Sequence, residues 1–221
     1  YSVENSLLIP DHYFLFPSLI IRNPKPLKSS AGFDAIAQSV ESLISIKSNK
    51  TSLYYAKKSL ELSLTSYLPF IKKPNLENSN KMLISSNLAG KAINISKTTA
   101  PHAVSYPFSS MFGISHGHAV SLTFEKFLLF NYLNLNRSLS SFNLNNRYKI
   151  IFKLFKVKNI NELCQKIKYI KYQANLSDSF TKLGINISSS SDKILSQVNT
   201  LRLKNNPVML TKNDIRKILN D

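Results

Sequence analysis

The chain has 221 residues, of which 43% are hydrophobic, and it carries a formal net charge of +17 with a mean hydropathy of −0.12. This size and composition fit a folded protein with a substantial core, as one domain or as one domain with a fragment of another. They exclude a membrane protein, because no stretch reaches the roughly 18 uncharged apolar residues of a span. The single cysteine, Cys164, excludes an internal disulfide framework. We therefore expect a cytoplasmic protein without a signal peptide.

The positive charge by itself leaves two interpretations open. Binding to nucleic acid is one, because lysine and arginine neutralise phosphates. The basic residues are dispersed, however, and pairs such as Lys57-Lys58 and Lys72-Lys73 never grow into a longer run. A basic field that attracts an anionic substrate or a dinucleotide fits the same charge. A basic helical module for nucleic acid or partner binding is thus the alternative to an enzyme.

The first 23 residues differ from the rest of the chain. Short apolar runs are cut by Pro10 and Pro17, which predicts extended segments and turns, not helix. From Lys28 onward, apolar residues recur with helical spacing, and a long helix is predicted there. Asp34, Gln38 and Glu41 line up at i, i+4 and i+7 on a face of that helix away from the apolar stripe.

The remainder of the chain predicts an all-helical body, because strand propensity is low and only five glycines occur. The second of these helices is predicted to end before Pro69. The helix that contains Pro101 is predicted to end near Pro107 to Ser110. Ala89-Gly90 is expected to allow a close helix approach. The predicted helices after the first cover residues 51–67, 79–96, 98–110, 116–131, 144–155, 160–173, 191–203 and 212–220, with a short turn at 177–183.

Three of the four histidines of the chain fall between residues 102 and 118. Two of them, His102 and His116, lie on consecutive short helices joined by a tight turn at Gly113. With Asp34 they form a set of one carboxylate and two imidazoles, which suits Zn²⁺ or Fe²⁺. Spacing alone leaves ordinary roles open, since a histidine at a helix start is commonly a cap and an aspartate within a helix commonly faces solvent.

Four segments together resemble the iron-containing (group III) alcohol dehydrogenases. Their order and spacing match, and Asn205-Asn206-Pro207 before a last helix is similar to the end of those proteins. The segments are Gly32-x-Asp34-Ala35-x-x-Gln38-x-x-Glu41-Ser42, Ala89-Gly90-x-Ala92-Ile93-Asn94, Thr98-Thr99-Ala100-Pro101-His102-Ala103-x-Ser105-Tyr106 and Ser115-His116-Gly117-His118-Ala119-Val120.

The resemblance implies a dehydroquinate synthase-like fold, in which an α/β nucleotide-binding domain precedes an all-helical metal-binding domain. Residues 1–23 would be the tail of the first domain and residues 24–221 the helical domain. The ligands implied for Fe²⁺ or Zn²⁺ are Asp34, His102 and His116. A fourth ligand position of the family, a histidine, falls on Gln38, which implies a weak or water-mediated contact.

The resemblance also implies an NAD(P)H-dependent aldehyde reductase. It is nearest to a branch that reduces phosphonoacetaldehyde to 2-hydroxyethylphosphonate, a part of phosphonate metabolism. Lys97, Thr98 and Thr99, at the start of the helix that carries His102, would bind the anionic group of such a substrate. Tyr106 and His118 are the candidates for proton transfer, with water as a third route.

The glycine-rich segment that this family uses for NAD(P) does not occur in the sequence. Most of the cofactor site would then lie outside these residues, and Tyr1 in place of Met favours a partial sequence. We expect this portion alone to be inactive, whereas the complete protein would be an enzyme or a catalytically inactive remnant. The sequence leaves open whether the protein forms a homodimer.

Overall fold

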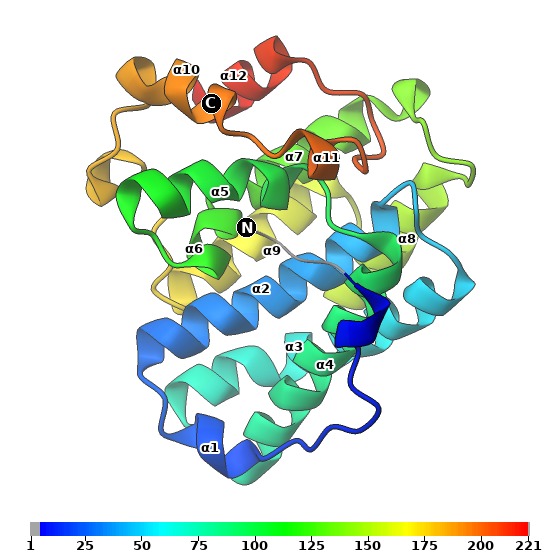
Figure 1. Ribbon diagram of the computed structural model, residues 1–221, viewed down its shortest axis with the longest axis vertical. Coiled ribbons are helices and arrows are strands. Elements are labelled where there is room, and N and C mark those ends of the chain that lie inside the picture. Colours follow the sequence, from blue (N-terminus) through cyan, green and yellow to red (C-terminus); the bar gives the residue numbers. More distant parts are fainter. Residues whose placement is uncertain (1–4, 221) are drawn as a thin grey trace.

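The longest helices of the computed structural model are α2 (Lys25–Ile44), α3 (Lys50–Lys72) and α4 (Leu76–Ser96). The structure describes residues 5–220, so the first four residues of the predicted tail lie outside it. The three helices run antiparallel and form one end of the molecule (Figure 1). Within residues 5–220 there are helices and loops but no strand, which confirms the all-helical prediction.

Asparagine side chains determine where α3 and α4 begin. Asn49 Oδ1 accepts a hydrogen bond from the Ser52 backbone N–H at 2.9 Å, and the Ser52 hydroxyl accepts one from the Asn49 N–H. Asn75 and Asn78 form the same reciprocal pair at α4. These bonds satisfy N–H groups that the first turn of a helix leaves unpaired.

Buried serines join α2, α3 and α4 across their contact. The Ser39 hydroxyl donates to the Ser59 hydroxyl at 2.7 Å, and the Ser59 and Ser85 hydroxyls lie 3.0 Å apart. All three residues are fully buried. Small side chains let the backbones approach closely, while each hydroxyl finds a partner and so avoids the cost of an unpaired buried polar group.

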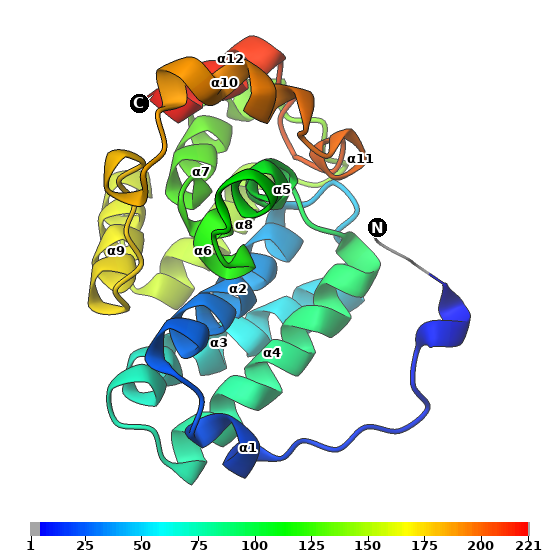
Figure 2. The ribbon, with the colours of Figure 1, turned by 60° about the vertical axis from the view of Figure 1, so that its left-hand side comes forward.

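A second group of helices packs on α2 and covers its other side (Figure 2). The group consists of α5 (Ala100–Phe112), α6 (His116–Ser121), α7 (Phe124–Leu133), α8 (Leu144–Phe155) and α9 (Ile160–Gln173). A buried ion pair connects two helices of this group, α7 and α9. Lys171 Nζ lies 2.7 Å and 2.8 Å from the two carboxylate oxygens of Glu125.

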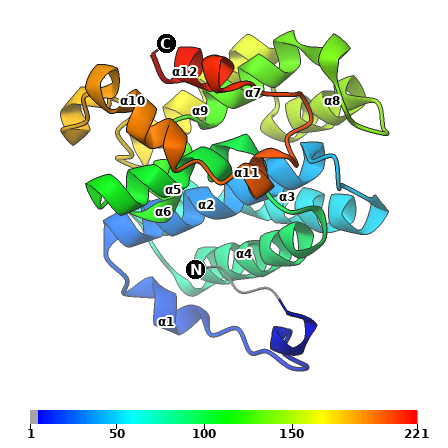
Figure 3. The ribbon, with the colours of Figure 1, turned by 45° about the horizontal axis from the view of Figure 1, so that its top comes forward.

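The C-terminal helices are α10 (Ile187–Ser196), α11 (Thr200–Leu203) and α12 (Lys212–Asn220). They pack on α5, with α10 and α12 on the side away from α3 and α4 (Figure 3). Their apolar side chains join those of α5 in a cluster that includes Phe108 and Ile194. A second, larger cluster lies between α2, α3, α8 and α9. The metal-ligand candidates on α2, α5 and α6 therefore stand between two packed cores.

The N-terminal segment runs along the outside of α4 (Figure 2). It holds the short helix α1 (Pro17–Ile21), and Lys91 of α4 donates to the Tyr13 hydroxyl at 2.8 Å. Several of its apolar side chains are open to solvent, with Leu7 90% and Phe14 80% exposed. This segment thus presents apolar surface that the described residues do not cover.

The predicted boundaries of residues 144–155, 160–173 and 212–220 are confirmed. The prediction of no helix in residues 1–23 is wrong at α1, where Pro17 occupies a first-turn position that needs no N–H. Pro69 and Pro107 lie inside α3 and α5 instead of ending them, because burial of the following residues favours continuing the helix. Further differences are the break between α6 and α7, an earlier start of α4 and α10, and the separation of α10 from α11.

None of the described helices combines the length and the apolar character needed to cross a bilayer.

Candidate metal centre

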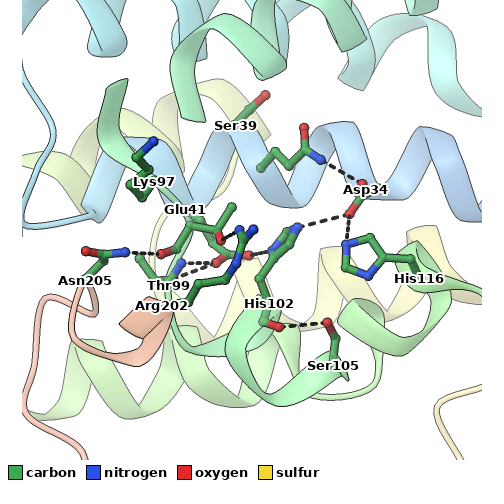
Figure 4. A network of polar contacts seen from close by, with 12 residues as sticks. Asp34, Ser39, Glu41, Lys97, Thr99, His102, Ser105, His116, Arg202 and Asn205 are labelled. Atoms are coloured by element: carbon green, nitrogen blue, oxygen red, sulfur yellow. Dashed lines mark hydrogen bonds and ion pairs between the residues drawn. The ribbon is translucent and has the colours of Figure 1, made fainter. Parts of the chain in front are cut away.

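Asp34, His102 and His116 come from three different helices and converge at one point (Figure 4). Asp34 Oδ1 lies 3.2 Å from His102 Nε2 and 3.7 Å from His116 Nε2. One ligand atom of each residue lies within 4.8 Å of the others. The structure therefore brings together the three residues that the sequence indicates as ligands.

Two glycines allow α6 to lie close to α2. Gly113 ends α5 in the left-handed conformation, at φ 67°, and turns the chain toward α6. A Cβ atom at Gly117 would lie 2.0 Å from the Ser30 carbonyl oxygen and 3.0 Å from Asp34 Cβ. Only glycine fits at that contact, which fixes His116 directly over the turn of α2 that carries Asp34.

Glu41, also on α2, contacts the His102 ring at the nitrogen that faces away from Asp34. Its Oε1 lies 2.5 Å from His102 Nδ1, and its Oε2 accepts hydrogen bonds from the Thr99 backbone N–H at 2.6 Å and the Thr99 hydroxyl at 2.8 Å. An ionised carboxylate only accepts, so the Nδ1 atom must carry a hydrogen. A ring held in this way directs Nε2 toward the centre, as carboxylate partners do for metal-binding histidines.

The polar atoms at the centre lack protein partners. His102 Nε2 and Asp34 Oδ1 are buried and have no hydrogen bond of acceptable geometry among the described residues, although they lie within ion-pair distance. Unpaired buried polar atoms are costly, and their presence calls for a ligand. Two imidazole nitrogens and one carboxylate oxygen are a donor set that suits Zn²⁺ or Fe²⁺ and leaves a coordination position open. The residues therefore fit a divalent metal ion.

The charges at the centre are strongly coupled. Burial alone would lower the pKa of His102, but the carboxylates of Glu41 and Asp34 outweigh it and raise that pKa to about 10. Burial would raise the pKa of Asp34, yet the neighbouring His102 imidazole, with further contributions from His116 and Gln38, keeps it below its usual value. Two carboxylates thus act on the His102 ring, Glu41 at Nδ1 and Asp34 at Nε2, and favour positive charge on or beside it.

Gln38 lies one turn beyond Asp34 on α2, and its amide nitrogen donates to Asp34 Oδ2 at 2.7 Å. This bond holds one carboxylate oxygen and leaves Oδ1 directed at the two histidines. The arrangement gives Gln38 a positioning role toward Asp34, while a weak or water-mediated contact between Gln38 and a metal stays a prediction.

Tyr106 and His118 occupy different surroundings. The Tyr106 ring lies 5.9 Å from the His116 ring, centroid to centroid, so Tyr106 borders the centre. His118 Nε2 instead lies 2.7 Å from the Ser177 carbonyl oxygen, and His118 is outside the cluster of ligand atoms. Of the two candidates for proton transfer, Tyr106 is therefore the one beside the ligands.

The hydroxyls of Thr98 and Thr99 are fully buried and have protein partners. Thr99 donates to Glu41, and Thr98 accepts a hydrogen bond from Arg202 Nη1 at 2.8 Å. Both threonines thus anchor the start of α5 from inside the protein, and neither hydroxyl faces solvent. Lys97, half-buried with φ 58°, closes α4 just before them.

Sequence reasoning assigned no role to Glu41 or Arg202. Glu41 was detectable, because it shares a helix face with Asp34 and lies two turns further on. Arg202 belongs to α11, and no local motif marks it. Its guanidinium carbon lies 5.4 Å from the centroid of the Tyr106 ring, which places a positive charge beside the centre.

The family model for the C-terminal part of Fe-containing alcohol dehydrogenases matches residues 28–221. The chain belongs to this family. Among curated proteins, 1-propanol dehydrogenase PduQ of Citrobacter freundii is 28% identical to this chain over 133 residues. The aligned region covers 59% of this chain and 36% of that protein. This chain is 25% identical over 125 residues to the phosphonoacetaldehyde reductase of Streptomyces viridochromogenes, covering 56% of this chain and 31% of that protein.

Solved structures show the same fold. Sulfoacetaldehyde reductase from Bifidobacterium kashiwanohense, in complex with NAD⁺, superimposes with a TM-score of 0.79 at 23% identity over 92% of this chain and 52% of that one. An archaeal alcohol dehydrogenase from a Red Sea brine pool gives a TM-score of 0.83 at 20% identity over the same shares. The chain thus spans about a third of the curated relatives and about half of these structures.

Proposed function

We propose that this chain is the metal-binding portion of an NAD(P)H-dependent aldehyde reductase whose substrate carries an anionic group, phosphonoacetaldehyde being the leading candidate. The observation that carries the proposal is the His102 ring, held by Glu41 so that its unpartnered Nε2 faces Asp34 and His116. Asp34, His102 and His116 would hold Fe²⁺ or Zn²⁺. When bound, such an ion polarises a carbonyl oxygen and stabilises the negative charge that develops on it during reduction.

Tyr106 is the residue we propose to deliver the proton. Burial raises the pKa of its hydroxyl, and the Arg202 charge offsets only part of that rise. The hydroxyl is therefore protonated at neutral pH and can donate. His118, bonded to Ser177, is the weaker candidate.

Arg202 supports an anionic substrate. Its guanidinium stands beside Tyr106 at the edge of the centre. Burial lowers the pKa of His116, and the positive charges of His102 and Arg202 lower it further. A guanidinium offers planar paired donors that suit phosphonate, sulfonate or carboxylate oxygens. Two relatives act on aldehydes of that kind, the phosphonoacetaldehyde and sulfoacetaldehyde reductases. We assign anion recognition to Arg202 and Lys97, with Thr98 and Thr99 as their support.

The complete enzyme would join this portion to a nucleotide-binding domain that supplies most of the NAD(P)H site. Residues 1–23 would be the tail of that domain, and the exposed apolar side chains there, such as Leu7 and Phe14, are surface it could cover. A cytoplasmic location and a homodimer remain parts of this proposal.

The first experiment measures metal binding by the chain itself. Zinc or ferrous ion should bind with a stoichiometry of about one, and His102→Ala and His116→Ala should each abolish tight binding. Unchanged stoichiometry in both variants would refute the metal assignment. Retention on heparin that falls steeply with salt, with no metal bound, would instead favour the nucleic-acid alternative.

A second experiment uses the full-length protein. Arg202→Gln should lower kcat/KM for phosphonoacetaldehyde far more than for propanal, because only the first substrate has an anionic group. Equal losses for the two aldehydes would contradict the anionic substrate. No turnover of either aldehyde by a metal-loaded wild-type protein would identify a catalytically inactive remnant.

A further inference from the structure

A large cavity lies away from the candidate metal centre. It is a groove of about 770 Å³ between α3, α8 and α9, within the size range of small-molecule sites. The groove exists because α3 and α9 both pack beside α8 but diverge from one another, and Lys72 of α3 hydrogen-bonds Gln173 of α9 at one end.

Branched aliphatic side chains line its walls. Leu64 and Leu68 come from α3, Ile150 and Leu154 from α8, and all four are only partly buried. Three aromatic side chains also line the groove, but Tyr67 and Phe155 are buried, so that only Tyr169, which is 51% exposed, has much of its ring open to solvent. This surface suits a flexible hydrocarbon chain better than a flat aromatic ring, which needs stacking partners on both faces.

The rim is strongly basic. Four lysines border the groove, Lys57, Lys153, Lys156 and Lys166, against the single carboxylate of Glu61. That carboxylate pairs with Lys58, and within residues 5–220 none of the four rim lysines has a carboxylate partner. The rim thus offers uncompensated positive charge directly above an apolar surface.

The groove is separate from the metal centre but touches the same helix. Ile36 reaches the groove from α2, two residues after Asp34, and points to the opposite side of that helix. Tyr67 also lines it and donates to the Ser29 carbonyl oxygen of α2 at 2.6 Å. A ligand here would contact α2 from the side that the metal ligands do not use.

We propose that this groove binds a long-chain carboxylate, with the hydrocarbon chain on Leu64, Leu68, Ile150 and Leu154 and the carboxylate at Lys153 and Lys166. Both halves of the ligand are required. The apolar walls gain from burying a hydrocarbon chain, and the rim selects an anionic head over a neutral one.

The test titrates the 221-residue chain with dodecanoate below its micellar concentration, with 1-decanol and acetate as comparisons. Methyl NMR should show saturable shifts at Leu64, Leu68 and Ile150 with dodecanoate only. Lys153→Glu and Lys166→Glu should each weaken binding by about fivefold. Lys149→Glu and Lys168→Glu, at exposed lysines of the same helices outside the groove, should leave it unchanged.

Three outcomes would overturn the proposal. If 1-decanol binds as tightly as dodecanoate, the lysines do not select an anionic head group. If acetate binds as tightly as dodecanoate, the apolar walls do not contribute to binding. Shifts confined to the exposed apolar side chains of residues 7–19 would place the ligand elsewhere. None of these measurements involves metal or turnover, so the groove and the reductase proposal stand or fall separately.

Discussion

Replacing Glu41 with glutamine should weaken metal binding by about 10- to 100-fold while the protein remains folded. Glutamine has the size of glutamate, and its amide oxygen can still accept the hydrogen bond from His102 Nδ1. Its amide nitrogen must then face the Thr99 N–H, where the carboxylate oxygen now accepts at 2.6 Å. Two donors would meet there, and the fully buried negative charge of Glu41 would be lost.

The magnitude follows from these two losses. An unpaired buried N–H costs about 1–3 kcal/mol, which weakens the hold on the start of α5. The Glu41 charge favours either a proton or a metal ion at His102 Nε2, but the divalent ion gains more because it carries twice the charge. The net loss of metal affinity should be about 1.4–2.7 kcal/mol, the equivalent of that 10- to 100-fold change.

The assay is zinc competition against a chelator of known affinity, with thermal unfolding of the metal-free protein measured in parallel. Glu125→Gln is the matched control, because Glu125 is a buried glutamate that pairs with Lys171 outside the metal centre. It should lower the melting temperature and leave zinc affinity intact. If a folded Glu41→Gln protein binds zinc as tightly as the wild type, Glu41 does not position His102 and the argument fails.

Three further predictions concern Gln38, Gly117 and Cys164. Gln38→His should tighten zinc binding in chelator competition by adding an imidazole one turn from Asp34, and equal affinities would mean that position 38 does not reach the metal. Gly117→Ala should disrupt metal binding, since its Cβ meets backbone at 2.0 Å, whereas Gly90→Ala, with nothing within 4 Å, should raise stability by roughly 1 kcal/mol in urea unfolding. Cys164 should alkylate slowly: burial raises the pKa of its thiol to about 11, so the rate should climb about tenfold per pH unit from pH 7 to 9, and a plateau there would contradict the burial.

The sequence was sufficient to indicate the three candidate ligands, which the structure brings together, because each stands in a short motif. His102 follows a helix-starting proline, and His116 follows a glycine turn. The sequence was also sufficient for the helices of residues 144–155 and 160–173, whose apolar stripes are long and regular.

What the sequence could not supply were contacts between distant segments. The sequence predicts a close helix approach at Ala89-Gly90; Ala89 is fully buried, but Gly90 is exposed with open space around it, and the tight glycine contacts occur at Gly32 and Gly117. Proline at residue 69 was expected to end its helix, but packing of the residues after it decides otherwise. Arg202 reaches the centre only because α11 folds back on α5, which no local pattern encodes.

The three candidate ligands and Glu41 lie between residues 34 and 116, but the start of α5 is held by residues beyond position 200. Arg202 donates to the Thr98 hydroxyl, Asn205 donates to the Thr98 carbonyl oxygen at 3.1 Å, and the Asn205 carbonyl accepts from the backbone of Ile46. A chain shortened before residue 200 would keep all three candidate ligands and lose the contacts that hold the start of α5 beside α2. The loop between α11 and α12 therefore bears on the candidate metal centre, although none of its residues is a candidate ligand.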